Sequence, residues 1–120
     1  FMKDASLDVT DYSVYADTDE EPGHYTFFIE PDRVIRKEEL PEMRDKLEAR
    51  VMQANPSYGE KIRTGVLAPC EIIPVQQQTY QLYREMMIMK GVSPNQLKPV
   101  RVIDTPIKYR FFNGLRERYE

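Results

Sequence analysis

The segment 7–30, LDVTDYSVYADTDEEPGHYTFFIE, decides how this chain begins to fold. Apolar or aromatic side chains recur at every second position near its two ends: Tyr12, Val14, Ala16, Tyr25, Phe27 and Ile29. Side chains two residues apart lie on the same face of an extended strand, so residues 7–17 and 24–30 are predicted to be half-buried strands. The polar, turn-rich residues 18–23 separate them, and two strands across a short turn predict an antiparallel hairpin.

After position 37 the apolar spacing changes from two residues to three and four. One stripe recurs at helical spacing, and its members are Leu40, Met43, Leu47, Val51 and Ala54. The stripe predicts an amphipathic helix over residues 37–54, with Pro41 in the first turn, where a missing N–H costs nothing. Asn55-Pro56 is expected to end or bend this helix, and residues 57–69, with two glycines and a proline, are expected to be irregular.

The second half of the chain again alternates between strand and helix patterns. Residues 70–75 predict a short strand, with Pro74 at its end or at a sheet edge. Residues 79–90 predict a helix, and Gly91 stands where a C-terminal cap belongs. The large side chains of this helix are expected in the core: Tyr80, Tyr83, Met86, Met87 and Met89.

The chain ends with a predicted short strand, residues 100–103, and a predicted helix, residues 105–119. The resulting order of elements predicts an α+β fold. We expect a small mixed β-sheet of about four strands, with an N-terminal antiparallel hairpin, covered by two or three α-helices. A length of 120 residues suits one domain, residues 1–120.

Composition and charge exclude several classes of function. A net charge of −3 argues against binding to nucleic acid, because phosphate-backbone binders carry a basic excess. No apolar run approaches the roughly 20 residues that span a bilayer, so no membrane partner is expected. The single cysteine, Cys70, cannot form an internal disulfide, and the reducing cytoplasm is the expected location.

Five ordered blocks of sequence resemble one known protein family. They are Tyr15-Ala16-Asp17-Thr18, Pro22-Gly23-His24-Tyr25, Asn55-Pro56-Ser57-Tyr58, residues 91–101 (GVSPNQLKPVR) and Thr105-Pro106-Ile107. In this order and spacing they resemble the C-terminal domain of the Gretchen Hagen 3 family, the acyl-acid amido synthetases of plants and their bacterial relatives. A bacterial member is expected. The chain departs from the family pattern at Leu97, where tyrosine is usual, and at Pro99-Val100, whose order is reversed.

The resemblance implies a two-step enzyme of the adenylate-forming class. A large N-terminal domain of the same polypeptide would bind ATP with Mg²⁺ and a carboxylic acid, and would form an acyl-adenylate with loss of pyrophosphate. The amine of an amino acid would then attack to give an amide and AMP. Residues 1–120 would be the C-terminal mobile domain that swings over the active site between the steps. The isolated domain is expected to be inactive and to hold no cofactor.

Lys98 is the predicted catalytic residue. The resemblance implies that this loop lysine meets the phosphate or the adenylate, and a compact ammonium on a flexible stem suits the charge that develops as pyrophosphate leaves. Asn95, Gln96 and Arg101 are predicted to support the loop or the phosphate. In an extended segment Arg101 would point to the opposite face from Lys98, so a structural ion pair is the alternative for it.

The hairpin block supplies a second set of candidate residues: Asp17, Pro22, Gly23, His24 and Tyr25. His24 is the only histidine and no Cys/His cluster accompanies it, so no metal site is predicted. We expect its ring to fix the hairpin loop by hydrogen bonding rather than to act as a general base. The acidic residues 17–21 lack the glycine and the terminal glutamate of a calcium loop and predict a solvated turn. Cys70 begins an apolar strand and is expected to be buried and inert.

A second hypothesis stays open from the sequence. The chain could be a free-standing, non-catalytic α+β interaction module that has kept the fold without the chemistry. The altered Leu97-Lys98-Pro99 stretch motivates this hypothesis, as does the absence of a large domain from these residues. The two hypotheses differ in what they predict for Lys98, which matters for adenylation only in the first.

Overall fold

The computed structural model describes residues 9–19, 21–98 and 100–117 of the chain. The fold is α+β, as predicted, with a three-stranded mixed sheet and four α-helices. In chain order the elements are β1 (Val9–Asp17), β2 (His24–Pro31), the 3-10 turn η2 (Lys37–Glu39), α1 (Leu40–Ala54), α2 (Pro56–Arg63), β3 (Glu71–Pro74), α3 (Thr79–Met89), the 3-10 turn η3 (Pro94–Gln96) and α4 (Pro106–Gly114). The ends of two predicted elements, residues 7–8 and 118–119, lie outside the described residues.

The sheet has the order β1-β2-β3. β1 and β2 form the predicted antiparallel hairpin, from Asp17 opposite His24 at the turn to Val9 opposite Pro31. β3 pairs with β2 in parallel, and a parallel pair needs a long crossover, which α1 and α2 provide. β3 ends at Pro74 at the edge of the sheet, as the sequence predicts, and the next N–H, that of Val75, still donates to the Ile29 carbonyl of β2 (2.8 Å).

The predicted strand at residues 100–103 is reduced to a single bridge between Val14 and Val102. Two backbone hydrogen bonds hold it, from Val14 N–H to the Arg101 carbonyl (2.8 Å) and from Ile103 N–H to the Val14 carbonyl (2.9 Å). The pairing stops there because Thr105 already caps α4, its side chain accepting a hydrogen bond from Lys108 N–H. Three regular strands therefore stand where about four are expected.

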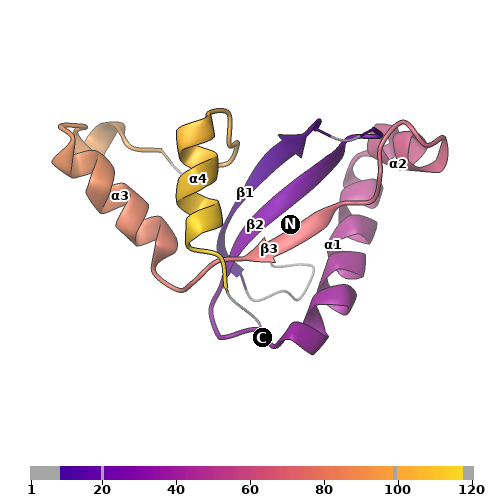
Figure 1. Ribbon diagram of the computed structural model, residues 1–120, viewed down its shortest axis with the longest axis horizontal. Helices are drawn as coiled ribbons and strands as arrows, with labels where there is room; N and C mark the ends of the chain where they lie inside the picture. Colours follow the sequence, from indigo (N-terminus) through magenta and orange to yellow (C-terminus); the bar gives the residue numbers. More distant parts are fainter. Residues whose placement is uncertain (1–8, 20, 99, 118–120) are drawn as a thin grey trace.

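Both faces of the sheet are covered (Figure 1), with α1 and α2 on one side and α3 and α4 on the other. Alternation along β2 divides its side chains between two cores, so that Phe27 and Ile29 pack toward α1 and Phe28 packs toward α4. The predicted faces of the two hairpin strands are confirmed. β2 is buried on both sides rather than half-buried, since all four residues from 26 to 29 are buried. β1 is half-buried, as predicted, with Ser13 its one buried residue.

The second helix is the main difference from the sequence prediction, because residues 57–63 were expected to be irregular. Asn55 ends α1 and caps α2, its side chain accepting a hydrogen bond from Tyr58 N–H, and Pro56 occupies the first turn. A Cβ at the buried Gly59 would lie 3.7 Å from the Met52 side chain, an ordinary van der Waals distance, so this glycine does not prevent α2 from packing beside α1. Pro56 ends α1, as predicted, and also initiates α2.

α3 follows its prediction in all but one residue. Tyr80, Tyr83, Met86 and Met87 join the second core, whereas Met89 is 87% exposed and so is not a core residue. Gly91 adopts a positive φ of 101° and caps the helix, donating from its N–H to the Ile88 carbonyl (2.9 Å). No helix within the described residues is both long and apolar enough to cross a membrane.

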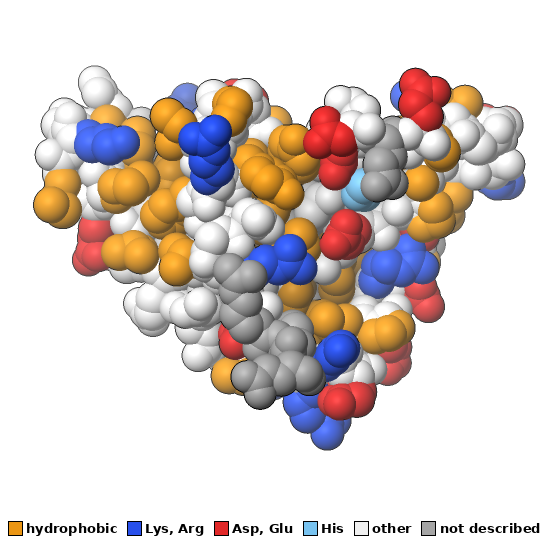
Figure 2. Space-filling view, in the orientation of Figure 1, with side chains coloured by type: hydrophobic (Ala, Val, Ile, Leu, Met, Phe, Trp, Pro, Cys, Tyr) orange, Lys and Arg blue, Asp and Glu red, His pale blue; other side chains and the backbone are white. Residues whose placement is uncertain are grey.

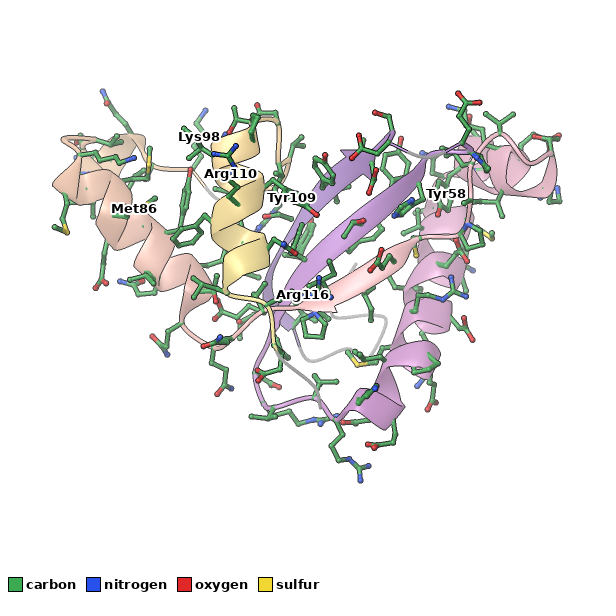
Figure 3. All side chains as sticks on the ribbon, viewed as in Figure 1. Tyr58, Met86, Lys98, Tyr109, Arg110 and Arg116 are labelled. Atoms are coloured by element: carbon green, nitrogen blue, oxygen red, sulfur yellow. The ribbon has the colours of Figure 1, made fainter. Side chains whose placement is uncertain are left out.

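A buried carboxylate joins α1, α2 and β3. Glu48 is 8% exposed, and its Oε1 accepts hydrogen bonds from the Tyr58 hydroxyl (3.0 Å) and from Cys70 N–H (2.9 Å). Its Oε2 accepts from Arg44 (3.0 Å), which also donates to the Cys70 carbonyl (3.2 Å). Figure 3 shows Tyr58 between the sheet and the first two helices. One charged side chain thereby satisfies polar groups from three elements.

Replacing Glu48 by alanine is expected to lower the free energy of unfolding by about 2–4 kcal/mol, because the variant leaves buried donors on Tyr58 and Cys70 unpaired. Urea titration followed by circular dichroism measures this change. Glu42→Ala is the matched control, since Glu42 lies on the same helix with a 75% exposed side chain paired to Lys46. The control should cost less than about 0.5 kcal/mol. Equal effects of the two substitutions would contradict the role given to Glu48.

Candidate functional site

Lys98 lies on the loop that connects α3 to the edge of the sheet. After the Gly91 cap the chain passes through η3, which is closed by a hydrogen bond from Gln96 N–H to the Ser93 carbonyl (2.9 Å). Leu97 is half-buried, and Lys98 is exposed directly after it. Asn95 is exposed as well. Figure 3 shows Lys98 at the α4 side of the molecule, far from Tyr58.

The loop returns to β1 immediately after Lys98. Arg101 forms an ion pair with Asp11, donates a second hydrogen bond to the Tyr12 carbonyl (3.2 Å), and places its guanidinium 4.4 Å from the centre of the Tyr12 ring. Arg101 therefore forms a structural ion pair, the alternative that its sequence position allowed. Its charge is therefore engaged with the sheet, and Lys98 remains the more accessible cation of the loop.

Two surface hollows flank Lys98. The first, of about 300 Å³, lies between α3 and the sheet, and its charged lining residues are Asp11, Glu30, Arg84 and Lys98. The second, of about 410 Å³, lies between the loop and α4, and its charged lining residues are all basic: Lys98, Arg101 and Lys108. Lys108 is paired with Asp104 (2.9 Å).

The ammonium of Lys98 is open to an external anion. Among the described residues, none accepts a hydrogen bond from it or lies within ion-pair distance. The second hollow places two further basic side chains beside it, Arg101 and Lys108, each paired with an aspartate. A cationic hollow with an accessible lysine at its rim suits a phosphate or a carboxylate ligand. Asn95 and Gln96 lie beside this lysine in sequence, and Gln96 lines the second hollow.

Comparison with protein families matches residues 1–107 to the GH3 family C-terminal domain. This match extends over most of the chain and includes all of the ordered sequence blocks. The chain belongs to the GH3 family.

Individual relatives agree with the family assignment. The chain is 28% identical over 130 aligned residues to the 4-substituted benzoates-glutamate ligase GH3.12 of Arabidopsis thaliana, an alignment that covers 93% of this chain and 23% of the relative. Among solved structures, the fold resembles GH3.15 acyl acid amido synthetase with a TM-score of 0.81 at 17% identity, over 98% of this chain and 22% of that chain. A complex of AtGH3.15 acyl acid amido synthetase with 2,4-DB matches with a TM-score of 0.68 at 17% identity, over 98% of this chain and 23% of that one.

The GH3 domain occupies only part of the proteins it resembles. The chain spans about a quarter of the length of these relatives. In them, the segment similar to this chain is joined to a much larger part of the same polypeptide.

The hairpin block of this GH3 domain forms a close turn next to β3. A Cβ on Gly23 would lie 2.9 Å from the Asp17 carbonyl oxygen, so only glycine fits this approach. His24 is 17% exposed, and its Nε2 lies 3.8 Å from Asp17 Oδ2 and 3.5 Å from Glu71 Oε2. The ring therefore lies between the hairpin and β3, a position compatible with the predicted role in fixing the turn.

The remaining residues of the hairpin block serve packing and local hydrogen bonding. Tyr25 packs against Tyr58 with ring centroids 5.8 Å apart, which brings the hairpin into contact with the Asn55-Pro56-Ser57-Tyr58 block. Asp17 Oδ1 accepts a hydrogen bond from Asp19 N–H (3.0 Å), while Pro22 is exposed.

The two sets of predicted site residues do not meet. No described residue of the hairpin block lines either hollow beside Lys98. Lys98 shares the first hollow with Asp11, and Asp11 lies six residues before Asp17, roughly 20 Å along an extended strand. The geometry therefore separates the hairpin block, which packs beside β3, from the loop that carries Lys98, called the lysine loop below.

The acidic turn and Cys70 are the remaining candidate features of the sequence. Among the described residues, no group of three or more His, Cys, Asp or Glu side chains is placed to hold a metal ion, and Glu20 of the acidic turn lies outside this set. Cys70 is 3% exposed, and its burial beside Glu48 raises the pKa of the thiol to about 11. A buried thiol that stays protonated at neutral pH is a poor nucleophile, which agrees with the inert role predicted for it.

Gly23→Ala is expected to lower the free energy of unfolding by about 1–3 kcal/mol, because the new methyl group would press against the Asp17 carbonyl. Gly114→Ala is the control, since nothing lies within 4 Å of a Cβ at that helical position. The control should be neutral or should stabilise by up to about 1 kcal/mol. Chemical denaturation of the two variants measures both changes. A Gly23→Ala variant as stable as the parent would show that the turn tolerates a side chain.

Proposed function

We propose that this chain is the C-terminal cap domain of an ATP-dependent acyl acid amido synthetase. Family membership supports the class of enzyme. The observation that carries a catalytic role is Lys98, an exposed lysine at the rim of a basic hollow, on a loop fastened to the sheet. The relative from Arabidopsis thaliana is a benzoate-glutamate ligase, which joins a carboxylic acid to an amino acid. Substrates of these two chemical classes are proposed here.

Lys98 contributes charge to the first step of the proposed reaction. When a carboxylate attacks the α-phosphate of ATP, negative charge accumulates on the phosphate oxygens and on the departing pyrophosphate. An ammonium that contacts these oxygens stabilises the transition state more than the ground state. The flexible stem of lysine lets the ammonium follow the phosphate as the bond breaks.

The remaining parts of the active site belong to the proposed large N-terminal domain of the same polypeptide. That domain would bind ATP with Mg²⁺, the acyl acid and the amino acid. The cap would close over it for adenylation and move between the two steps, as expected for a mobile domain. A chain whose single cysteine is a buried, protonated thiol is suited to the reducing cytoplasm, which is the proposed location.

The residues around Lys98 fit a phosphate ligand. In the hollow between the loop and α4 every charged lining residue is basic, and Lys98 makes no ion pair with another described residue. Arg101 and Lys108 would add long-range attraction for an anion, although each is itself paired with an aspartate.

A non-catalytic interaction module is the alternative function. The observation that favours it is an apolar groove of about 580 Å³ between α3 and α4, lined by Leu82, Met86, Met89 and Phe111. Figure 2 shows hydrophobic side chains gathered over these two helices. The groove alone does not distinguish the hypotheses, since a cap domain also needs a surface that meets its large domain.

Lys98→Ala in the complete polypeptide that contains this chain is expected to slow adenylation about 10²–10³-fold, measured by ATP–pyrophosphate exchange. Stability should be unchanged, because the side chain is exposed and its removal breaks no contact with another described residue. Lys61→Ala, an exposed lysine on α2 across the sheet, is the matched control and should exchange at the parental rate. Parental exchange by Lys98→Ala would favour the interaction module.

A further inference from the structure

Two hydroxyl groups, one on the buried Ser13 and one on the half-buried Tyr80, connect the lysine loop to the sheet. Ser13 is fully buried on β1, and its hydroxyl donates a hydrogen bond to the Val100 carbonyl, two residues beyond Lys98. The Tyr80 hydroxyl donates to Ser13 Oγ (2.8 Å). The Val100 carbonyl can only accept, so Ser13 uses its one proton there and its Oγ accepts from Tyr80. The Phe28 carbonyl is a second, longer acceptor for the Tyr80 hydroxyl (3.4 Å). Burial raises the pKa of Tyr80, which keeps this first donor protonated.

Tyr80 is itself fixed at the start of α3. Its backbone N–H donates to Glu30 Oε1 (2.9 Å), and the N–H of Gln78 donates to Glu30 Oε2 (3.3 Å). This carboxylate at the end of β2 caps a helix whose own N-cap residue, Gln78, provides no side-chain cap. The Tyr80 ring also packs on Phe112 of α4, with centroids 4.8 Å apart. Glu30 of β2 and Phe112 of α4 therefore hold Tyr80, the first of the two hydroxyl donors, in place.

The bond from Ser13 is one of several contacts that attach the segment after Lys98 to the rest of the domain. Val100 and Ile103 pack in the second core, Val102 forms the bridge to Val14 on β1, and Arg101 makes the contacts given above. Among the described residues, Val100 is the first after Lys98, and the Ser13 hydroxyl holds its carbonyl. Loss of this hydrogen bond would free the Val100 carbonyl while leaving both cores in place.

We propose that Ser13 and Tyr80 are positioning residues for Lys98. The proposal rests on the function proposed above. Their hydroxyl groups fix the Val100 carbonyl, which sets the direction of the backbone at Lys98 and the reach of its ammonium toward the phosphate. Charge stabilisation depends on placement, and a displacement of about 1 Å can cost 10²-fold in rate. The serine and the tyrosine themselves touch no substrate.

The test uses Ser13→Ala and Tyr80→Phe in the complete polypeptide, with pyrophosphate exchange as the readout. Each is expected to lower kcat for adenylation at least about tenfold, with KM for the acyl acid within about twofold of the parent. Tyr80→Phe keeps the aromatic ring in the core and so remains informative if Ser13→Ala folds poorly. Thr79→Val is the matched control, because Thr79 is 2% exposed and donates its hydroxyl to Gln76 within the start of α3. The Thr79→Val variant should be less stable than the parent and should have the same kcat.

A double variant separates positioning from general damage. Since Ser13 acts through Lys98, Lys98→Ala combined with Ser13→Ala should be no slower than Lys98→Ala alone. Additive losses, or a Ser13→Ala enzyme with parental kcat beside an impaired Lys98→Ala enzyme, would overturn the positioning role and leave the proposed function intact. Parental activity of Lys98→Ala would instead contradict the proposed function of Lys98, and with it the positioning role of Ser13 and Tyr80.

Discussion

Burial of the β2 strand on both of its faces is the constraint on which the other elements depend. Phe27 and Ile29 face α1, while Phe28 faces α4, and Phe28 and Ile29 have no exposed surface. Complete burial of such a side chain contributes about 1.5–3 kcal/mol relative to exposure. Neither set of helices could be removed without exposing one side of this strand. The sheet therefore provides a common support for two layers with different roles.

The two layers differ in where the hydrogen bonds of their polar side chains lead. On the α1 side, Glu48 accepts hydrogen bonds from Arg44 of α1, Tyr58 of α2 and Cys70, the residue before β3. On the α3 side, the hydroxyl groups of Tyr80 and Ser13 lead toward the surface and end at the lysine loop. The hydrogen bonds of Glu48 stay on the α1 side and contribute to stability. Those of Tyr80 and Ser13 connect the core to the loop of the residue proposed to contact phosphate.

Local pattern explains how much of the fold the sequence predicts. The hairpin, α1 and α3 follow from alternation at two residues and from stripes at three and four, which neighbouring side chains determine. α2 was not predicted because the glycines and the proline of residues 57–69 indicate a loop, whereas the capping of Tyr58 N–H by the Asn55 side chain and Pro56 in the first turn start a second helix. The strand predicted at residues 100–103 is shortened because α4 begins directly after it, a competition that strand propensity does not describe.

The candidate site is predictable to a similar extent. Lys98 follows from the resemblance of its loop to a known family, and its side chain is exposed. The hydrogen bond that holds the lysine loop could not be predicted from the sequence. Ser13 and Val100 are 87 residues apart, and an isolated serine in a strand does not indicate its partner. Glu48 is likewise 22 residues from Cys70 and borders the apolar stripe of α1 as an ordinary charged residue would. Long-range hydrogen bonds of this kind require the tertiary structure.

Acetylation of lysine side chains in the complete polypeptide, read by mass spectrometry, tests most directly whether this domain brings Lys98 to the adenylate. The measurement compares the free protein with one saturated by a non-hydrolysable acyl-adenylate analogue. Lys98 should lose most of its labelling in the complex, while the exposed Lys61 across the sheet should be labelled equally in both. Unchanged labelling of Lys98 in the saturated complex would contradict the proposed role of the cap.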